Sequence, residues 1–189
     1  MTNKSKQILK TVLSVAAFAI LIVGTYFAYN ALTGARDADN LNAGDGEMNI
    51  ADSAYDLALT DYDGNEVRLS DLKGKPIVLN FWASWCPPCK SEMPHFEKVY
   101  KELRDDVHFV MVNCVGSKES ETVKTAKAFI EKEGYNFPVY FDMTNQSYSK
   151  YGASTIPMTF FIDSEGNIKL YSKGAISENN LRVAIESVR

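Results

Sequence analysis

Apolar and polar positions divide the chain into two parts with different patterns. Val12–Leu32 reads VLSVAAFAILIVGTYFAYNAL, and no charged residue occurs from Thr11 to Ala35. As a helix this run would be roughly 31 Å long, which is enough to cross the hydrocarbon core of a bilayer. The surface helix of a globular domain has one apolar and one polar face, but this run is apolar on all sides. The pattern therefore predicts a transmembrane anchor over residues 11–32.

The flanks of this run predict its orientation. Three lysines precede the run, and acidic residues such as Asp37 follow it. Basic residues stay on the cytoplasmic side, so residues 1–10 are predicted to be cytoplasmic and the rest of the chain to lie outside the cell membrane. A cleaved signal peptide is the alternative, with residues 33–35 as a weak cleavage site, although its apolar region would normally span only about 7–15 residues.

The remainder of the chain predicts a linker followed by one domain. Residues 33–50 (TGARDADNLNAGDGEMNI) have no periodicity and no aromatic residue, which is typical of a flexible linker. In residues 51–189, short apolar runs alternate with amphipathic stretches. The predicted strands are Tyr55–Thr60, Glu66–Leu69, Ile77–Trp82, Val107–Val115, Val139–Phe141, Met158–Asp163 and Ile168–Tyr171. The predicted helices include Phe96–Leu103, Lys118–Glu133, Gln146–Tyr151 and Leu181–Val188. This order predicts the α/β class, with a mixed β-sheet flanked by helices.

The charge balance argues against two kinds of partner. Of the 20 Lys and Arg residues, three precede position 35, so the part beyond it carries 17 basic and 24 acidic residues and a net charge of −7. A surface of this sign favours neither nucleic acid nor an anionic membrane surface.

Two of the three cysteines form the motif WCPPCK, between a predicted strand and a predicted helix. Cys86 would lie exposed at the helix N-terminus, where unpaired N–H groups and the helix dipole favour the thiolate. Cys89 would lie one turn inside the helix, close enough to attack a mixed disulfide and release the product. This spacing predicts a redox-active disulfide between Cys86 and Cys89.

Two other uses of the cysteine pair fit less well. A zinc site needs about four ligands, and only Cys114, His95 and His108 remain, none with paired spacing. We therefore predict no metal and no other cofactor. A purely structural disulfide would close a loop so small that it would constrain the unfolded chain very little. Cys114 ends an apolar run and is predicted to be a small buried residue, with a regulatory thiol as the alternative.

The motif lies in a longer stretch that resembles a known family. FWASWCPPCK resembles the thioredoxin active-site segment, and LSDLKGKPIVLNFWASWCPPCKSEMP is similar to the extracytoplasmic, membrane-anchored proteins of the TlpA/ResA type. Three separated features also match: Pro94 within the first long helix, the extra helix at Lys118–Glu133, and a Thr-Ile-Pro sequence ending at Pro157. The resemblance covers about residues 53–189 and implies a thioredoxin-like fold.

The resemblance also implies residues that bind the substrate. Ile156 and Pro157 match the cis-proline loop that faces the active-site disulfide. A cis X-Pro bond turns the preceding backbone outward, so the N–H and C=O of Ile156 could pair with an extended client segment. The alternative is that Pro157 only begins the strand that follows. Trp85 resembles the exposed indole that contacts partner proteins.

One carboxylate is implied as a proton carrier. Asn80 stands six residues before Cys86, where thioredoxin has a buried aspartate, and an asparagine cannot titrate. The resemblance offers Glu92 instead, three residues after Cys89 and one turn along the helix. The alternative is a solvated glutamate in the first turn, stabilised by the helix dipole.

These observations predict an extracytoplasmic thiol–disulfide oxidoreductase that reduces disulfides in exported proteins. Under the resemblance, its electrons come from a membrane thiol carrier. Its clients are apocytochromes c, which gives a role in cytochrome c maturation, or other oxidised surface proteins. A disulfide-forming oxidase would run the same residues in reverse. A peroxiredoxin-like peroxidase would need Pro-x-x-x-Thr-x-x-Cys, but Ala83 occupies the threonine position. A copper chaperone on this fold would need CxxxC, which is one residue longer than the spacing here.

Overall fold

The computed structural model describes residues 13, 15–28, 41–43, 54 and 56–189. The chain forms two units, residues 1–39 and 40–189. In the first unit, residue 13 and residues 15–28 are helical and belong to the predicted anchor, whose other residues lie outside the described part. Among the residues that are described, we find no helix with the length and apolar character needed to cross a membrane.

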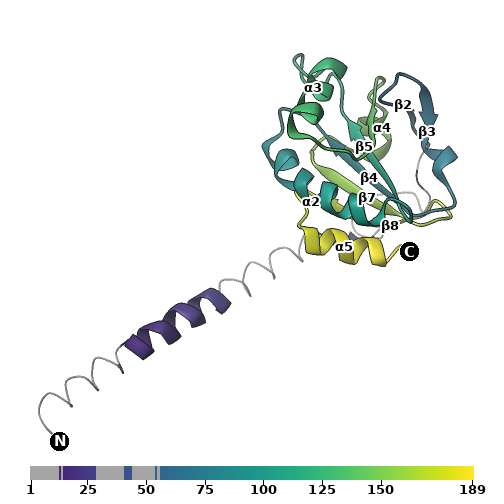
Figure 1. Cartoon of the computed structure of the whole chain (residues 1–189). Helices are drawn as coiled ribbons and strands as arrows, with labels where there is room; N and C mark the ends of the chain where they lie inside the picture. Colours follow the sequence, from purple (N-terminus) through teal and green to yellow (C-terminus); the bar gives the residue numbers. More distant parts are fainter. Residues whose placement is uncertain (1–12, 14, 29–40, 44–53, 55) are drawn as a thin grey trace, which may run out of the picture. The chain divides into compact units, whose positions relative to one another are not determined.

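The second unit is built on a mixed sheet (Figure 1). Its described strands are β1 (Leu41–Ala43), β2 (Ala58–Thr60), β3 (Glu66–Arg68), β4 (Ile77–Trp82), β5 (His108–Asn113), β6 (Val139–Phe141), β7 (Met158–Ile162) and β8 (Ile168–Lys173). Across the sheet they run in the order β1-β8-β7-β4-β5-β6-β2-β3. Strands β4, β5 and β6 are parallel, and β7 pairs antiparallel with both β4 and β8. This confirms the predicted mixed sheet.

Helices cover both faces of this sheet. They are η1 (Leu69–Leu72), α2 (Pro87–Leu103), α3 (Val123–Glu133), α4 (Gln146–Tyr151) and α5 (Glu178–Glu186). The apolar sides of α2, α3 and α5 share one core with the sheet, and α2 and α5 lie side by side in Figure 1. Residues of η1 and α4 contribute to the core on the opposite face. The predicted arrangement of a sheet flanked by helices is therefore confirmed.

Strand β4 is buried along its whole length because both of its faces are covered. Val78 and Trp82 face the core under α2, whereas Leu79 and Phe81 face the opposite core. Asn80 is the one polar residue of this strand, and it is fully buried. A polar side chain in such a position needs hydrogen-bond partners, and those partners define the site described below.

Helix α2 begins directly after the turn that follows β4. Cys86 is its N-cap, and Pro87 and Pro88 occupy the first two helical positions. Proline is well suited there, because its missing N–H is one that a helix leaves unpaired in any case. The sequence therefore places the cysteine pair at the carboxyl end of a central strand.

Several element boundaries differ from the prediction. The helix predicted at Lys118–Glu133 begins only at Val123, because Thr122 caps it by accepting a 3.2 Å hydrogen bond from the N–H of Thr125. Of the first predicted strand of the domain, Ala58–Thr60 is a strand, whereas Asp56 and Leu57 are not part of it. Residues 41–43, within the predicted linker, form β1 and pair antiparallel with β8.

Candidate active site

Cys86 and Cys89 form a disulfide at the start of α2. The S–S distance is 2.09 Å and the Cα–Cα distance is 5.3 Å. The N–H of Cys89 donates a hydrogen bond of 3.3 Å to Cys86 Sγ. Pro87 and Pro88, the two residues between the cysteines, have no N–H to offer. The backbone of the motif thus provides one donor to the sulfur of Cys86.

The burial of the two cysteines is more even than we expected. Cys89 is 0% exposed, as predicted for the second cysteine, but Cys86 is only 2% exposed rather than open to solvent. The side chain of Cys86 is covered because Ile156 packs beside it: Cys86 Sγ lies 3.7 Å from the carbonyl oxygen of Ile156. The exposed residues at the helix tip are Pro87 and Pro88.

The loop before β7 faces the disulfide, although it lies 70 residues further along the chain. The Ile156–Pro157 peptide bond is cis, as the resemblance implied. Ile156 is half-buried and Pro157 is buried. The carbonyl of Ile156 therefore lies beside the sulfur that an incoming disulfide would contact.

Glu92 lies on α2 one turn after Cys89, and it is buried, with an exposed fraction of 1%. Its two carboxylate oxygens accept hydrogen bonds from the side chain of Asn80, at 2.8 Å, and from the N–H of Ile176, at 2.9 Å. Burial raises the pKa of Glu92 to about 8, although the hydrogen bonds from Ile176 and Asn80 act in the opposite direction. The interpretation of Glu92 as a solvated residue of the first turn is wrong, because the sheet and the segment before α5 enclose it.

Sequence reasoning noticed Asn80 only as a residue that cannot titrate, and it missed two members of this group. The amide of Asn80 donates to Glu92 and also to the hydroxyl of Thr159, at 2.9 Å. Thr159 and Ile176 come from distant parts of the chain. Thr159 lies opposite Asn80 in the β4–β7 pair. The signal available in the sequence was Thr159 itself, a polar residue within the apolar run MTFFI.

Trp85 is half-buried beside the disulfide and is held by two residues of the loop after β5. Its indole N–H donates to Ser117 Oγ at 3.2 Å, and Lys118 Nζ lies 3.7 Å from the ring centroid. The indole is therefore less exposed than the resemblance implied. Because a cation over an aromatic face is attracted to it, Lys118 helps to fix the orientation of the ring.

A cavity of about 440 Å³ adjoins the site. It is lined by Trp85, Cys114, Ser117, Asn145, Ser147, Ala153, Ser154 and Ile156. Cys114 is 7% exposed, and burial raises the pKa of its thiol to about 12. The prediction that Cys114 is buried is confirmed, and a thiol with this pKa is a poor nucleophile at neutral pH.

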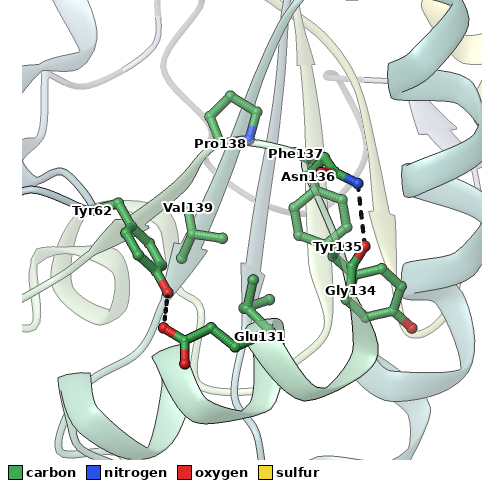
Figure 2. A pocket seen from close by; sticks show the side chains of 9 residues that line it. Tyr62, Glu131, Gly134, Tyr135, Asn136, Phe137, Pro138 and Val139 are labelled. Carbon is green, nitrogen blue, oxygen red and sulfur yellow. Dashed lines mark hydrogen bonds between the residues drawn. The ribbon is translucent and has the colours of Figure 1, made fainter.

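A second cavity, of about 520 Å³, lies between α3, β6 and the turn after β2 (Figure 2). Tyr62 and Glu131 meet across it through a 2.8 Å hydrogen bond. None of the cysteines lines this cavity. In the described part of the chain, no group of three or more His, Cys, Asp or Glu side chains converges as metal ligands would.

Comparisons with known proteins agree with this geometry. The AhpC/TSA family matches residues 50–171. The thiol-disulfide oxidoreductase ResA of Geobacillus thermodenitrificans is 34% identical over 141 residues, which are 74% of this chain and 78% of the relative. The crystal structure of StoA from Bacillus subtilis has 28% identity and a TM-score of 0.61, over 71% of this chain and 98% of that one. The exposed lipoprotein thioredoxin Etrx1 of Streptococcus pneumoniae has 31% identity and a TM-score of 0.63, over 70% of this chain and 99% of that one.

Proposed function

This chain belongs to the AhpC/TSA family and is a thiol–disulfide oxidoreductase with a thioredoxin-like fold, and we propose that it reduces disulfides in exported proteins. The observation that carries the proposal is the Cys86–Cys89 disulfide at the start of α2, with a buried carboxylate, Glu92, on the same helix. We assign the attack on the client to Cys86 and the resolution of the mixed disulfide to Cys89. Cys86 is assigned the attack because it is the helix cap and faces the Ile156 carbonyl.

Two exchange steps complete the reaction. The thiolate of Cys86 attacks a client disulfide, forms a Cys86–client disulfide and releases one client thiolate. The thiolate of Cys89 then attacks Cys86 Sγ, forms the Cys86–Cys89 disulfide and releases the second client thiolate. Two electrons thereby pass to the client. A membrane dithiol carrier returns them by reducing Cys86–Cys89 and becoming a disulfide itself.

The second step needs a proton acceptor, because Cys89 must lose its proton before it attacks. Glu92 supplies this acceptor in the proposal: it lies one turn from Cys89, and its pKa of about 8 is close to neutral pH. A base with a pKa close to the working pH combines a useful deprotonated fraction with a good affinity for the proton. The client thiolates that the exchange releases then take up the proton that Glu92 received from Cys89.

The client would lie over the tip of α2, between two contacts. The backbone of Ile156, next to Pro157, would pair with an extended client segment, since its carbonyl already lies beside Cys86 Sγ. The Trp85 indole would cover the other side of the client. Apocytochromes c are the proposed client class.

The direction of the reaction depends on how well the Cys86 thiolate is stabilised. Of the backbone groups in the motif, the N–H of Cys89 is the one that donates to Cys86 Sγ. A thiolate with few donors keeps a less depressed pKa, which makes the disulfide less oxidising. We therefore expect a midpoint potential of about −270 mV, as in thioredoxin, rather than about −120 mV, as in a strong oxidase.

Equilibration of the full-length protein in dithiothreitol and glutathione buffers measures this potential. A midpoint above about −180 mV would contradict the reductase and favour the alternative, a disulfide-forming oxidase. The clients are identified separately, by expressing Cys89→Ser in the native host and recovering the proteins held on Cys86 as mixed disulfides. Cys86→Ser is the matched control, because it cannot form the first mixed disulfide.

The proposed location is the outer face of the cell membrane, with residues 11–32 as a single-pass anchor. The uncharged run of the sequence supports the anchor, and the structurally similar Etrx1, an exposed lipoprotein, supports the position outside the cell. Reporter fusions after residue 50 should report an exported position, and the intact protein should resist extraction with carbonate. A shortened, soluble mature form would instead support a cleaved signal peptide.

A further inference from the structure

A buried carboxylate outside the catalytic group lies in the loop between β5 and α3. Glu121 is 2% exposed. One of its oxygens accepts hydrogen bonds from the N–H of Ser84, at 2.8 Å, and from the side-chain amide of Asn113, at 2.7 Å. The other accepts from the hydroxyl of Ser84, at 2.6 Å. All three donors are neutral groups, so the contact depends on geometry rather than on an ion pair.

Ser84 lies two residues before Cys86, in the turn between β4 and α2. The N–H of Cys86 donates to the carbonyl of Ala83 at 3.1 Å, which closes this turn. The pairing of β4 with β5 continues as far as a bond from the N–H of Cys114 to the carbonyl of Trp82, at 2.9 Å. The paired register of the two strands ends at Trp82 and Asn113. The Glu121 side chain then connects them again, between Ser84 and the end of β5 at Asn113.

The loop that carries Glu121 is itself closed by its backbone. The N–H of Gly116 donates to the carbonyl of Glu121, and the N–H of Glu121 donates to the carbonyl of Lys118, both at 2.9 Å. Ser117 and Lys118, within the same loop, hold the indole of Trp85. Two consecutive residues ahead of Cys86 are therefore fixed by one short loop.

We propose that Glu121 is a positioning residue for Cys86. Its carboxylate anchors Ser84 by both the backbone and the side chain, and so sets where the sulfur of Cys86 lies relative to the N–H of Cys89 and the carbonyl of Ile156. The inference rests on Cys86 as the attacking thiol of the proposed function, and it explains why a buried acid occurs in a loop that contains no catalytic group.

A glutamine at position 121 can preserve this anchor. Its oxygen would accept from the Ser84 N–H and from Asn113, as the first carboxylate oxygen does. Its amide would donate to the Ser84 hydroxyl, which rotates to accept. An alanine would lose all three bonds. Glu121→Gln therefore keeps the hydrogen bonds and removes the charge, whereas Glu121→Ala removes both.

The experiment measures how fast iodoacetamide alkylates Cys86 in the reduced full-length protein, with the labelled peptide identified by mass spectrometry. This reaction needs no client, so it remains informative even if the proposed client class is wrong. We expect Glu121→Ala to slow alkylation about tenfold or more, because small displacements of a reacting group are costly, and Glu121→Gln to stay within about twofold of the wild type. Ser84→Ala, which keeps the backbone bond, should fall between them.

Glu97 offers a matched control on α2. It is also buried, at 8% exposed, and accepts hydrogen bonds from the N–H and the side-chain amide of Asn136, each at 2.8 Å. Glu97→Ala should lower the thermal unfolding temperature without slowing alkylation of Cys86. Equal slowing in Glu97→Ala and Glu121→Ala would overturn the proposal. A wild-type rate of Cys86 alkylation in folded Glu121→Ala would also overturn it. Where Glu121→Ala does not fold, a wild-type rate in Ser84→Ala would have the same meaning.

Discussion

The side-chain amide of Asn80 donates a 2.8 Å hydrogen bond to the carboxylate of Glu92, in a region where Asn80 is 0% and Glu92 is 1% exposed. A second hydrogen bond, to Thr159, holds the same amide in place. Because asparagine carries no charge, Glu92 does not face a second carboxylate on β4. Its proton affinity is therefore governed by burial, and this leads to three of the predictions that follow.

Replacing Glu92 by Gln should slow disulfide exchange about tenfold to hundredfold at neutral pH, because the acceptor for the Cys89 proton is removed. The packing should survive, since the Oδ1 atom of Asn80 has no partner among the described residues and can accept from the new amide if Asn80 turns. Stopped-flow reduction of a model disulfide across pH 5 to 9 measures the effect. Glu97→Gln is the control, and an unchanged pH profile in Glu92→Gln would exclude the proton-transfer role.

The same substitution should change how stability depends on pH. The folded-state pKa of Glu92 is raised from 4.5 to about 8, so its contribution is fully present below 4.5 and is lost as the pH rises through about 8. The loss should be on the order of 3–5 kcal/mol, at about 1.4 kcal/mol for each unit of pKa difference. Urea unfolding of wild type and Glu92→Gln at several pH values isolates this term. Parallel curves for the two proteins would contradict it.

Replacing Asn80 by Asp should move the pH dependence of exchange in the alkaline direction, by about one unit or more. Two neighbouring carboxyls cannot both ionise easily in a buried site, so they would share a proton and titrate as a pair. The control is Asn136→Asp, which places a carboxylate beside Glu97 in the same way. A shift of equal size in the control would mean that the effect is not specific to the Glu92 group.

Reduced protein should react with iodoacetamide first at Cys86. Cys86 is the helix cap and its sulfur accepts a hydrogen bond from the Cys89 N–H, whereas Cys89 lies inside the first turn of α2. Cys114 should stay unlabelled in the folded protein because burial raises the pKa of its thiol to about 12. We expect Cys86 to be labelled at least about tenfold faster than the other two. Faster labelling of Cys89, seen by peptide mass spectrometry, would reverse the assigned roles.

Trp85→Ala should weaken reduction of protein clients while leaving reduction of a small disulfide within about twofold of the wild type. The indole lies beside the cysteine pair but makes no contact that the sulfur chemistry itself needs, and aromatic side chains contribute strongly to protein contacts. Tyr62→Ala is the control, because Tyr62 lines the separate cavity of Figure 2. Loss of activity toward both substrate types would place Trp85 in the chemistry instead.

Much of the fold could be predicted from the sequence because local patterns determine it. Ile77–Trp82 is apolar on both faces and lies in the centre of the sheet, and Val139–Phe141 and Gln146–Tyr151 have the predicted boundaries. The motif WCPPCK likewise fixes its own geometry, since two prolines suit the start of a helix and the spacing brings two sulfurs together. A predicted helix boundary was wrong where a side chain forms a hydrogen bond outside the helix. Glu121 fits a helix by pattern, but it bonds Ser84 instead, and the helix starts after it.

The carboxylate chemistry was decided by tertiary structure. From the sequence, Glu92 could be a solvated residue of the first helical turn or a buried proton carrier, because local spacing is the same for both. Its burial depends on Asn80 from β4 and on the segment before α5, whose Ile176 lies 84 residues away along the chain. Proton affinity in a protein follows from the solvation and the hydrogen bonds around a group. Those surroundings exist only once distant segments have packed together, so the sequence determined which residues could react and the fold decided how readily Glu92 gives up its proton.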